Sequence, residues 1–307
     1  LLDCHPIVRD FIAGHLVSQD EAFWIEGNSV LFDFLLRKSH RKSDLMEELE
    51  LLFRAVTHGA QAKRYEEAFD VYFNKIKNRQ FSIPTEVSHH ADHACLRAFF
   101  EIPWVKPVPS LAEDAQMYLL ASAATNLIYL GKINDATEPC YTGIRWFLAN
   151  GRWEEAAGAA APLASMLIAA GELPKAMQLI DELDPAILNS GSEVVSAMAL
   201  NFRAYILYLT GDLENADKYF AESDEVITKL IPLKPVNSPT ISSYYCKYLL
   251  ETGQTSKALD RSLKTFAWRH RKSWQTKIDT TSLLASDTLV QGLIFMEMGD
   301  LSNAKEY

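Results

Sequence analysis

Apolar residues recur along much of the chain at helical spacing, and one turn signal separates successive helical stretches. A glycine stands where an apolar stretch ends, and an alanine follows five residues later. This signal occurs at Gly131/Ala136, Gly151/Ala156, Gly171/Ala176, Gly211/Ala216, Gly253/Ala258 and Gly299/Ala304. Glycine accepts the left-handed conformation that ends a helix, and alanine lets the next helix pack closely on its neighbour. The pattern therefore predicts a stack of helix pairs.

The spacing of these signals predicts how the helices are paired. Five of the glycines, at 131, 171, 211, 253 and 299, stand 40, 40, 42 and 46 residues apart, so each interval has room for two helices. Gly151 marks the passage from one helix hairpin to the next, and an earlier copy of the signal has Lys63 in place of glycine. No segment alternates with period two over a length that indicates a sheet. We expect an all-α fold, a right-handed α-solenoid of helix hairpins.

The first third of the chain is less regular. Residues 20–38 have apolar side chains at 23, 24, 31, 34 and 35, which predicts an amphipathic helix, and residues 44–58 and 65–77 resemble a helix pair. The segment 78–110 holds four prolines and three histidines, and we expect a short helix flanked by irregular linkers. The predicted regions are 1–18, a helical arm at 19–110 and repeats at 111–307.

Composition and charge narrow the function classes. The net charge of −10 and the pI of about 5.3 disfavour a dedicated nucleic-acid binder. No apolar stretch approaches the roughly 18 residues of a membrane span, and the first residues lack the features of a signal peptide. The four cysteines lie far apart without a Cys-x-x-Cys pair, which favours reduced thiols and a cytoplasmic location. Both ends look cut, so we expect a piece of a longer protein.

The turn signal resembles that of a known repeat family. The segment Tyr208-Leu-Thr-Gly-Asp-Leu-Glu-Asn-Ala-Asp-Lys-Tyr-Phe220 is similar to the inter-helix turn of the tetratricopeptide repeat. The unit here is nearer 40 residues than 34, so the repeats are divergent. The resemblance covers residues 112–307 and implies a surface that binds protein.

The N-terminal residues resemble a second family. The stretch Leu2-Asp-Cys-His5-Pro6-Ile-Val-Arg9-Asp-Phe11 looks like the segment that closes the winged-helix region of bacterial STAND ATPases, relatives of NACHT and NB-ARC receptors. Residues 20–35 and 52–59 also resemble helices that lead into the repeats of those proteins. In related receptors a Met-His-Asp motif contacts bound ADP. Pro6 replaces the aspartate here, so the resemblance assigns a nucleotide contact to His5 alone.

This resemblance implies a signalling role. The repeats would sense a trigger protein and hold an upstream nucleotide-binding module closed until the trigger binds. The module would then exchange ADP for ATP, oligomerise and activate an effector domain. In bacterial family members the trigger is often a phage component and the outcome is antiviral defence. No phosphate-binding loop occurs in residues 1–307, so ADP or ATP is expected only in the upstream domain.

No catalytic motif stands out, since neither Gly-x-Ser-x-Gly nor His-Glu-x-x-His occurs. We therefore expect a non-catalytic region. Two other functions remain open: a stand-alone tetratricopeptide adaptor, and the inducer-binding repeat domain of a STAND transcriptional regulator.

Two groups of side chains are candidates for binding. Aromatic and arginine side chains are enriched at interface hot spots, and the predicted trigger contacts are Tyr244, Tyr245, Trp268, Arg269, Arg271 and Trp274. The alternative is that the aromatics are core and the cations are solvated. His89 and His93 stand one helical turn apart near Cys95, but a structural zinc site needs four ligands and no second cluster complements them. We predict no metal site.

Overall fold

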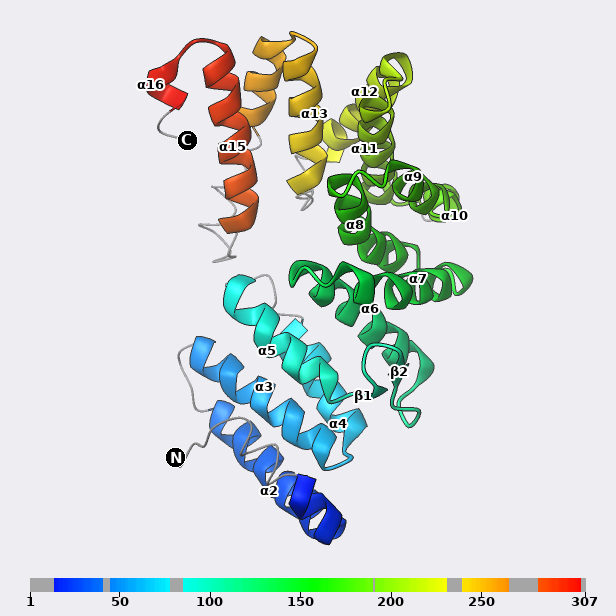
Figure 1. Ribbon diagram of the computed structural model, residues 1–307, viewed down its shortest axis with the longest axis vertical. Coiled ribbons are helices and arrows are strands. Elements are labelled where there is room, and N and C mark those ends of the chain that lie inside the picture. The colour runs from blue at the N-terminus through cyan, green and yellow to red at the C-terminus, as the bar shows by residue number, and fades with distance from the viewer. Residues whose placement is uncertain are drawn as a thin grey trace. The chain divides into compact units, whose positions relative to one another are not determined.

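The computed structural model describes residues 14–40, 45–77, 85–189, 191–230, 239–264 and 281–304 (Figure 1). Regular structure in these residues is almost entirely helical, which confirms the all-α prediction. The chain divides into two compact units, Leu1–Leu119 and Leu120–Tyr307, and each is described by itself. The division falls inside the helix α6, so the predicted domain boundary at 110/111 stays a prediction.

The first unit is built from helices and one small strand pair. After helical residues 14–19 its elements are α2 (Glu21–Ser39), α3 (Leu45–Gln61), α4 (Tyr65–Asp70), the π-helix η1 (Val71–Ile76), α5 (Thr85–Arg97), β1 (Phe100–Ile102) and β2 (Lys106–Pro107). The predicted helices at 20–38, 44–58 and 65–77 are confirmed. The carboxylate of Asp20 caps α2 by accepting a hydrogen bond from the backbone N–H of Phe23 at 3.0 Å.

The linker predicted to be irregular after α5 instead forms an antiparallel strand pair. Phe100 pairs with Pro107 and Ile102 with Lys106, and Trp104 at the tip has a φ of 62°. Two strands of three and two residues are too short to produce a detectable alternation of polar and apolar positions.

The second unit consists of helices, most of which are separated by short turns. Its elements are the end of α6 (Glu113–Tyr129), α7 (Ile133–Ala149), α8 (Trp153–Ala169), α9 (Leu173–Asp181), α10 (Asp184–Asn189), α11 (Glu193–Leu209), α12 (Leu213–Leu230), α13 (Pro239–Glu251), helical residues 255–264, α15 (Thr281–Glu297) and α16 (Leu301–Ala304). Helices begin at 113, 133, 153, 173, 193 and 213, so the structural period is 20 residues per helix.

The predicted helix-ending glycines all adopt a left-handed conformation. At Gly131, where φ is 73°, the N–H donates to the carbonyl of Ile128 at 2.9 Å and the next N–H donates to Leu127 at 2.8 Å. This pair of bonds is a Schellman motif, which satisfies carbonyls at the end of a helix. The same pattern follows at Gly151, Gly171, Gly211, Gly253 and Gly299. Gly191 also has a positive φ, 60°, and extends the 20-residue series that the sequence pattern missed at this point.

The alanines after these turns are buried where the helices approach one another. Ala136, Ala156, Ala176, Ala216 and Ala258 are fully buried, as is Ala68 after the Lys63 turn. Backbone groups come within reach of small side chains at the same crossings: the thiol of Cys140 donates to the carbonyl of Ala159 at 3.3 Å. The burial predicted for the alanines is found at these five turns.

Successive hairpins of the second unit are joined through their first helices. α11 packs on its partner α12 and also contacts α8, α9 and α13, and α13 in turn contacts α15 (Figure 1). α7 and α8, which belong to neighbouring hairpins, also pack together. Each hairpin thus buries its apolar faces partly against its own second helix and partly against the next hairpin.

The apolar residues of α2 do not form the single face that the sequence analysis predicted. Leu35 is buried against α3, but Phe23, Leu31 and Phe34 are exposed, and Trp24 is half-buried. The buried side of α2 also includes two polar residues, Asn28 and Ser39. Polar contacts to neighbouring helices therefore decide which side of α2 is buried.

Candidate protein-binding surface

Five tyrosines from α11 and α13 gather in the second unit. Tyr205 and Tyr244 are stacked, with ring centroids 3.9 Å apart and planes 7° from parallel. Tyr208 follows Tyr205 by three residues, and its ring centroid lies 6.0 Å away. The stacking joins α11 to α13, the first helices of two successive hairpins.

The hydroxyl group of Tyr244 extends the contact to a third helix. The hydroxyl interacts with the side chain of Ser165 in α8, and the ring centroid lies 6.0 Å from that of Phe202 in an edge-to-face arrangement. Burial raises the pKa of Tyr244 to about 12, and the interaction with Ser165 opposes part of this shift. A single side chain thus links α8, α11 and α13.

Tyr248 connects the same helices to α12. Its hydroxyl donates to a carboxylate oxygen of Asp217 at 3.1 Å, and its ring lies 5.4 Å from Tyr208 and 4.9 Å from Phe220. Burial, and next the hydrogen bond to Asp217, raises the pKa of Tyr248 to about 12. Burial, and next the negative charge of Glu251, also raises the pKa of Tyr205.

Tyr245 lies between an aromatic ring and a cation. It stacks on Phe220, with centroids 4.8 Å apart, and the guanidinium of Arg261 lies 4.7 Å from its ring centroid. Arg261 also donates to a carboxylate oxygen of Asp224 and forms an ion pair with it. Burial lowers the pKa of Arg261 to about 10, which leaves the guanidinium charged at neutral pH. We call these five tyrosines, with Phe202, Phe220 and Arg261, the tyrosine cluster.

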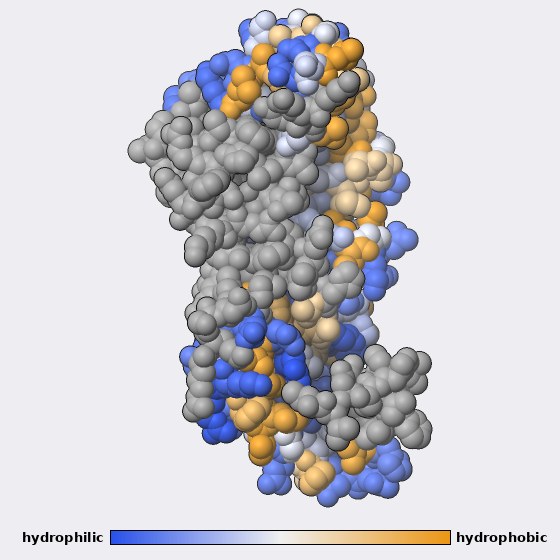
Figure 2. Space-filling model, turned by 90° about the vertical axis from the view of Figure 1, so that its left-hand side faces the viewer, coloured by the Kyte–Doolittle hydropathy of each residue, from blue (hydrophilic) through white to orange (hydrophobic). Residues whose placement is uncertain are grey.

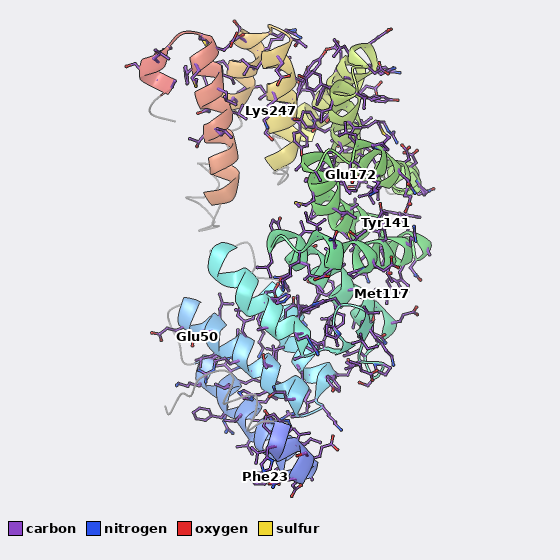
Figure 3. All side chains as sticks on the ribbon, viewed as in Figure 1. Phe23, Glu50, Met117, Tyr141, Glu172 and Lys247 are labelled. Carbon is purple, nitrogen blue, oxygen red and sulfur yellow. The ribbon has the colours of Figure 1, made fainter. Side chains whose placement is uncertain are left out.

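The cluster contains two of the predicted contact residues. Tyr244 and Tyr245 are half-buried, and each uses a ring face inside the cluster, so only part of either ring remains accessible to a partner. The side chains of α13, where Lys247 is labelled, are shown in Figure 3. Trp268, Arg269, Arg271 and Trp274 lie outside the described residues, as does His5. Sequence spacing found the tyrosines but gave no information on Phe220, Arg261 or Ser165, which come from other helices.

The histidine-rich segment of α5 shows another arrangement. Asp92 is buried and accepts hydrogen bonds from the Tyr72 hydroxyl at 2.9 Å and the Lys77 ammonium at 2.6 Å. The ring of His93 packs 4.5 Å from that of Trp104, and burial raises the pKa of the Cys95 thiol well above its usual value. The side chains of His89 and His90 lie outside the described ones. The side chains that are described contain no group of three suitable metal ligands.

The first unit has an open pocket of about 410 Å³ between residues 14–19 and the helices α2, α3, α4 and α5. Trp24, Ile25 and Ala60 line it with apolar surface. At its rim Lys63 pairs with Glu21 at 2.7 Å, and Arg97 donates to the carbonyl of Phe100 at 2.9 Å. Because Lys63 and Arg97 already bind groups of the protein itself, the pocket offers a ligand mainly apolar surface.

Comparison with known proteins identifies no family. No family model matches the sequence, and a search of curated proteins finds no match. Within the described parts of the chain, none of the helices combines the length and apolar character needed to cross a bilayer.

Proposed function

We propose that this chain is a protein-binding repeat region that serves as the sensor and autoinhibitory arm of a STAND-type signalling NTPase. The observation that carries the proposal is the repeated turn: a left-handed glycine with a Schellman motif, followed by a fully buried alanine, at regular positions through the second unit. These features are local equivalents of the tetratricopeptide turn, and repeats of that kind bind proteins on the surface of their first helices.

The packing of the first helices supports this proposal. α8, α11, α13 and α15 are in contact in chain order, which is how a tetratricopeptide-like solenoid forms a continuous wall. The tyrosine cluster lies within α11, α12, α13 and residues 255–264. Its half-buried rings, of Tyr208, Tyr244 and Tyr245, would contact the partner, and Arg269 and Arg271 favour a partner with an acidic or mixed-charge surface.

The switching mechanism requires only differential binding. The repeats hold the upstream module closed, and the trigger stabilises the open state because it binds that state more tightly. Exchange of ADP for ATP and oligomerisation follow in the upstream module, and in a bacterial host the trigger is a phage component. His5 contacts the bound nucleotide in that assembly.

The proposal is tested first at the level of the gene. The sequence encoded before Leu1 should contain a phosphate-binding loop and a winged-helix region, and the full-length protein should purify with bound ADP. Residues 1–307 alone should hydrolyse no ATP above background. An upstream sequence without a phosphate-binding loop would refute the STAND assignment while leaving protein binding by the repeats open.

A second experiment tests the docking residues in the full-length protein. Reversing both charges in Arg269→Glu/Arg271→Glu should abolish the response to the trigger, whereas the same reversal at exposed Lys257 and Lys264 should preserve it. His5→Ala should change the basal activity without the trigger. If the arginine variant responds like the parent, this patch is not the docking site.

A further inference from the structure

A band of apolar side chains remains exposed along α2. Phe23 is 63% exposed, Val30 61% and Phe34 50%, and Leu31 lies beside them. Gly27 lies in the same band and has open space where its Cβ would be. The space-filling view shows hydrophobic surface in its lower part, at the height of α2 and α3, and Figure 3 labels Phe23 near the start of α2 (Figures 2 and 3). We call Phe23, Gly27, Val30, Leu31 and Phe34 the α2 stripe.

Polar contacts on the other side of α2 fix the stripe in its outward position. Asn28 accepts a hydrogen bond from the His58 ring at 2.8 Å and donates to the carbonyl of Trp24. A Cβ on Gly59 would lie 3.0 Å from the ring of Phe32, so α2 and α3 touch closely there. Rotating α2 to bury the stripe would break these contacts and expose Phe32.

A second tie comes from the turn that precedes α4. Arg64 donates to Asp33 at 2.9 Å and to Ser29 at 3.0 Å, and its guanidinium lies 4.5 Å from the ring centroid of Phe32. These bonds hold the middle of α2 against the rest of the unit. The exposed stripe is therefore a fixed feature of the fold and not a consequence of a loosely placed helix.

The order of residues in the stripe is that of a helix-pairing seam. Phe23, Gly27, Val30 and Phe34 follow one another at steps of four, three and four residues, the spacing of a and d positions in a heptad. A contiguous apolar patch of this kind on a helix marks an interaction site. An antiparallel partner with the same sequence would place Phe23 opposite the partner's Phe34 and Gly27 opposite the partner's Val30. The two Gly–Val pairs then lie at the centre of the seam, on either side of the two-fold axis, and a pair of phenylalanines lies at each end.

The charges at the ends of the stripe favour that same arrangement. Asp20 lies at the N-terminal end of α2, and Arg37 and Lys38 lie in its last turn. In an antiparallel pair, Asp20 meets the partner's Arg37 and Lys38, whereas a parallel pair would place like charges together. Glu26 would approach the partner's Asp33, but Arg64 already pairs with Asp33 at 2.9 Å and removes most of that repulsion.

We propose that two copies of this chain form a homodimer through antiparallel contact of their α2 stripes. This contact depends on α2 alone and is distinct from the oligomerisation of an upstream nucleotide-binding module. The seam spans about three turns of one helix from each copy, so it is smaller than the roughly 800 Å² per partner of a typical stable interface, and we expect a weak dimer whose population depends on concentration.

Sedimentation equilibrium of the full chain tests the proposal. The parent protein should shift with concentration from the 34.6 kDa monomer to twice that mass. Val30→Asp should weaken dimerisation by about 100-fold, because it places an unpaired charge in the seam. Val105→Asp is the matched control: Val105 is 68% exposed in the strand pair of the same unit, and its variant should dimerise like the parent. A parent that stays monomeric, or a Val30→Asp variant that still dimerises, overturns the proposal.

Cysteine crosslinking tests the orientation, in a background where Cys4 is replaced by serine. Phe23→Cys mixed with Phe34→Cys should give a disulfide-linked heterodimer, and neither variant should crosslink with itself. Crosslinked Phe23→Cys homodimers would indicate a parallel pair and overturn the antiparallel arrangement. Thermal melting monitored by circular dichroism should show every variant folded, since the substituted side chains are exposed.

Discussion

The ring of Tyr205 in α11 lies flat against the ring of Tyr244 in α13, with centroids 3.9 Å apart. The Tyr244 hydroxyl also interacts with Ser165 of α8, so this pair connects helices from three successive hairpins. Tyr244, which the sequence analysis proposed as a recognition residue, thus also stabilises the packing between hairpins.

The two contributions of Tyr244 can be separated by substitution. Tyr244→Phe keeps the stacked ring and removes the hydroxyl that interacts with Ser165, which should lower the free energy of unfolding by about 0.5–1.5 kcal/mol. Tyr244→Leu should cost more, and a double-mutant cycle with Tyr205→Leu should give a coupling of about 0.5–1.5 kcal/mol. Urea denaturation of the four proteins measures both values. A coupling near zero would show that the stacking contributes nothing beyond buried area.

Close packing at the repeated alanine should be equally measurable. Ala216 is fully buried in α12, so Ala216→Leu should destabilise the protein by about 1–3 kcal/mol through overpacking. Glu214→Leu in the same helix is the control, because Glu214 is exposed and its replacement should change stability by less than about 0.5 kcal/mol. If urea denaturation gives the two variants the same unfolding free energy, Ala216 is not at a tightly packed helix contact.

The features that could be predicted from sequence are those with a local cause. A left-handed turn depends on one residue, so the glycines at 131, 151, 171 and 211 identified their helix ends directly. Gly191 was missed because Ser196, and not alanine, stands five residues after it. The turn signal required both a glycine and an alanine five residues later, although the glycine alone determines the left-handed turn.

Features that depend on packing between elements could not be predicted in this way. Which side of α2 is buried is decided by contacts such as Asn28 to His58 and Asp33 to Arg64, between residues about 30 positions apart. Phe220 and Arg261 reach the tyrosine cluster from two further elements, and no spacing along the sequence links them to Tyr245. The tyrosines of α11 and α13 were visible as a composition signal, but their stacking was not.

The divergent turn at Lys63 offers a test of the glycine rule. Lys63 adopts a φ of 59°. The turn has the same two backbone hydrogen bonds as the glycine turns: the N–H of Lys63 donates to the carbonyl of Ala60, and the N–H of Arg64 donates to the carbonyl of Gly59. A side chain in this conformation is strained, so Lys63→Gly should be more stable than Lys63→Ala by about 1 kcal/mol. Both variants lose the ion pair between Lys63 and Glu21. The difference between Lys63→Gly and Lys63→Ala therefore reports the backbone conformation and not the lost charge. Equal unfolding free energies would show that the turn is not strained.

The last prediction concerns the pH dependence of the contact between α2 and α3. His58 is half-buried. Its Nδ1 atom lies against the Asn28 side-chain oxygen, which can only accept, so Nδ1 of His58 carries a proton. Burial, and next the positive charge of Arg54, lowers the pKa of His58 below 6.5. The unfolded chain therefore binds a proton more readily than the folded one in the window just below pH 6.5. Stability is full above that window and falls as the pH decreases through it.

Unfolding free energies from pH 7.5 to 5 measure this effect. His58→Gln should be less stable than the parent at pH 7.5, because glutamine fits the site less well, but its stability should fall less on acidification. The control is His40→Gln at the exposed C-terminal end of α2, which should reproduce the slope of the parent. A parent slope unchanged by His58→Gln would assign the acid sensitivity to other groups.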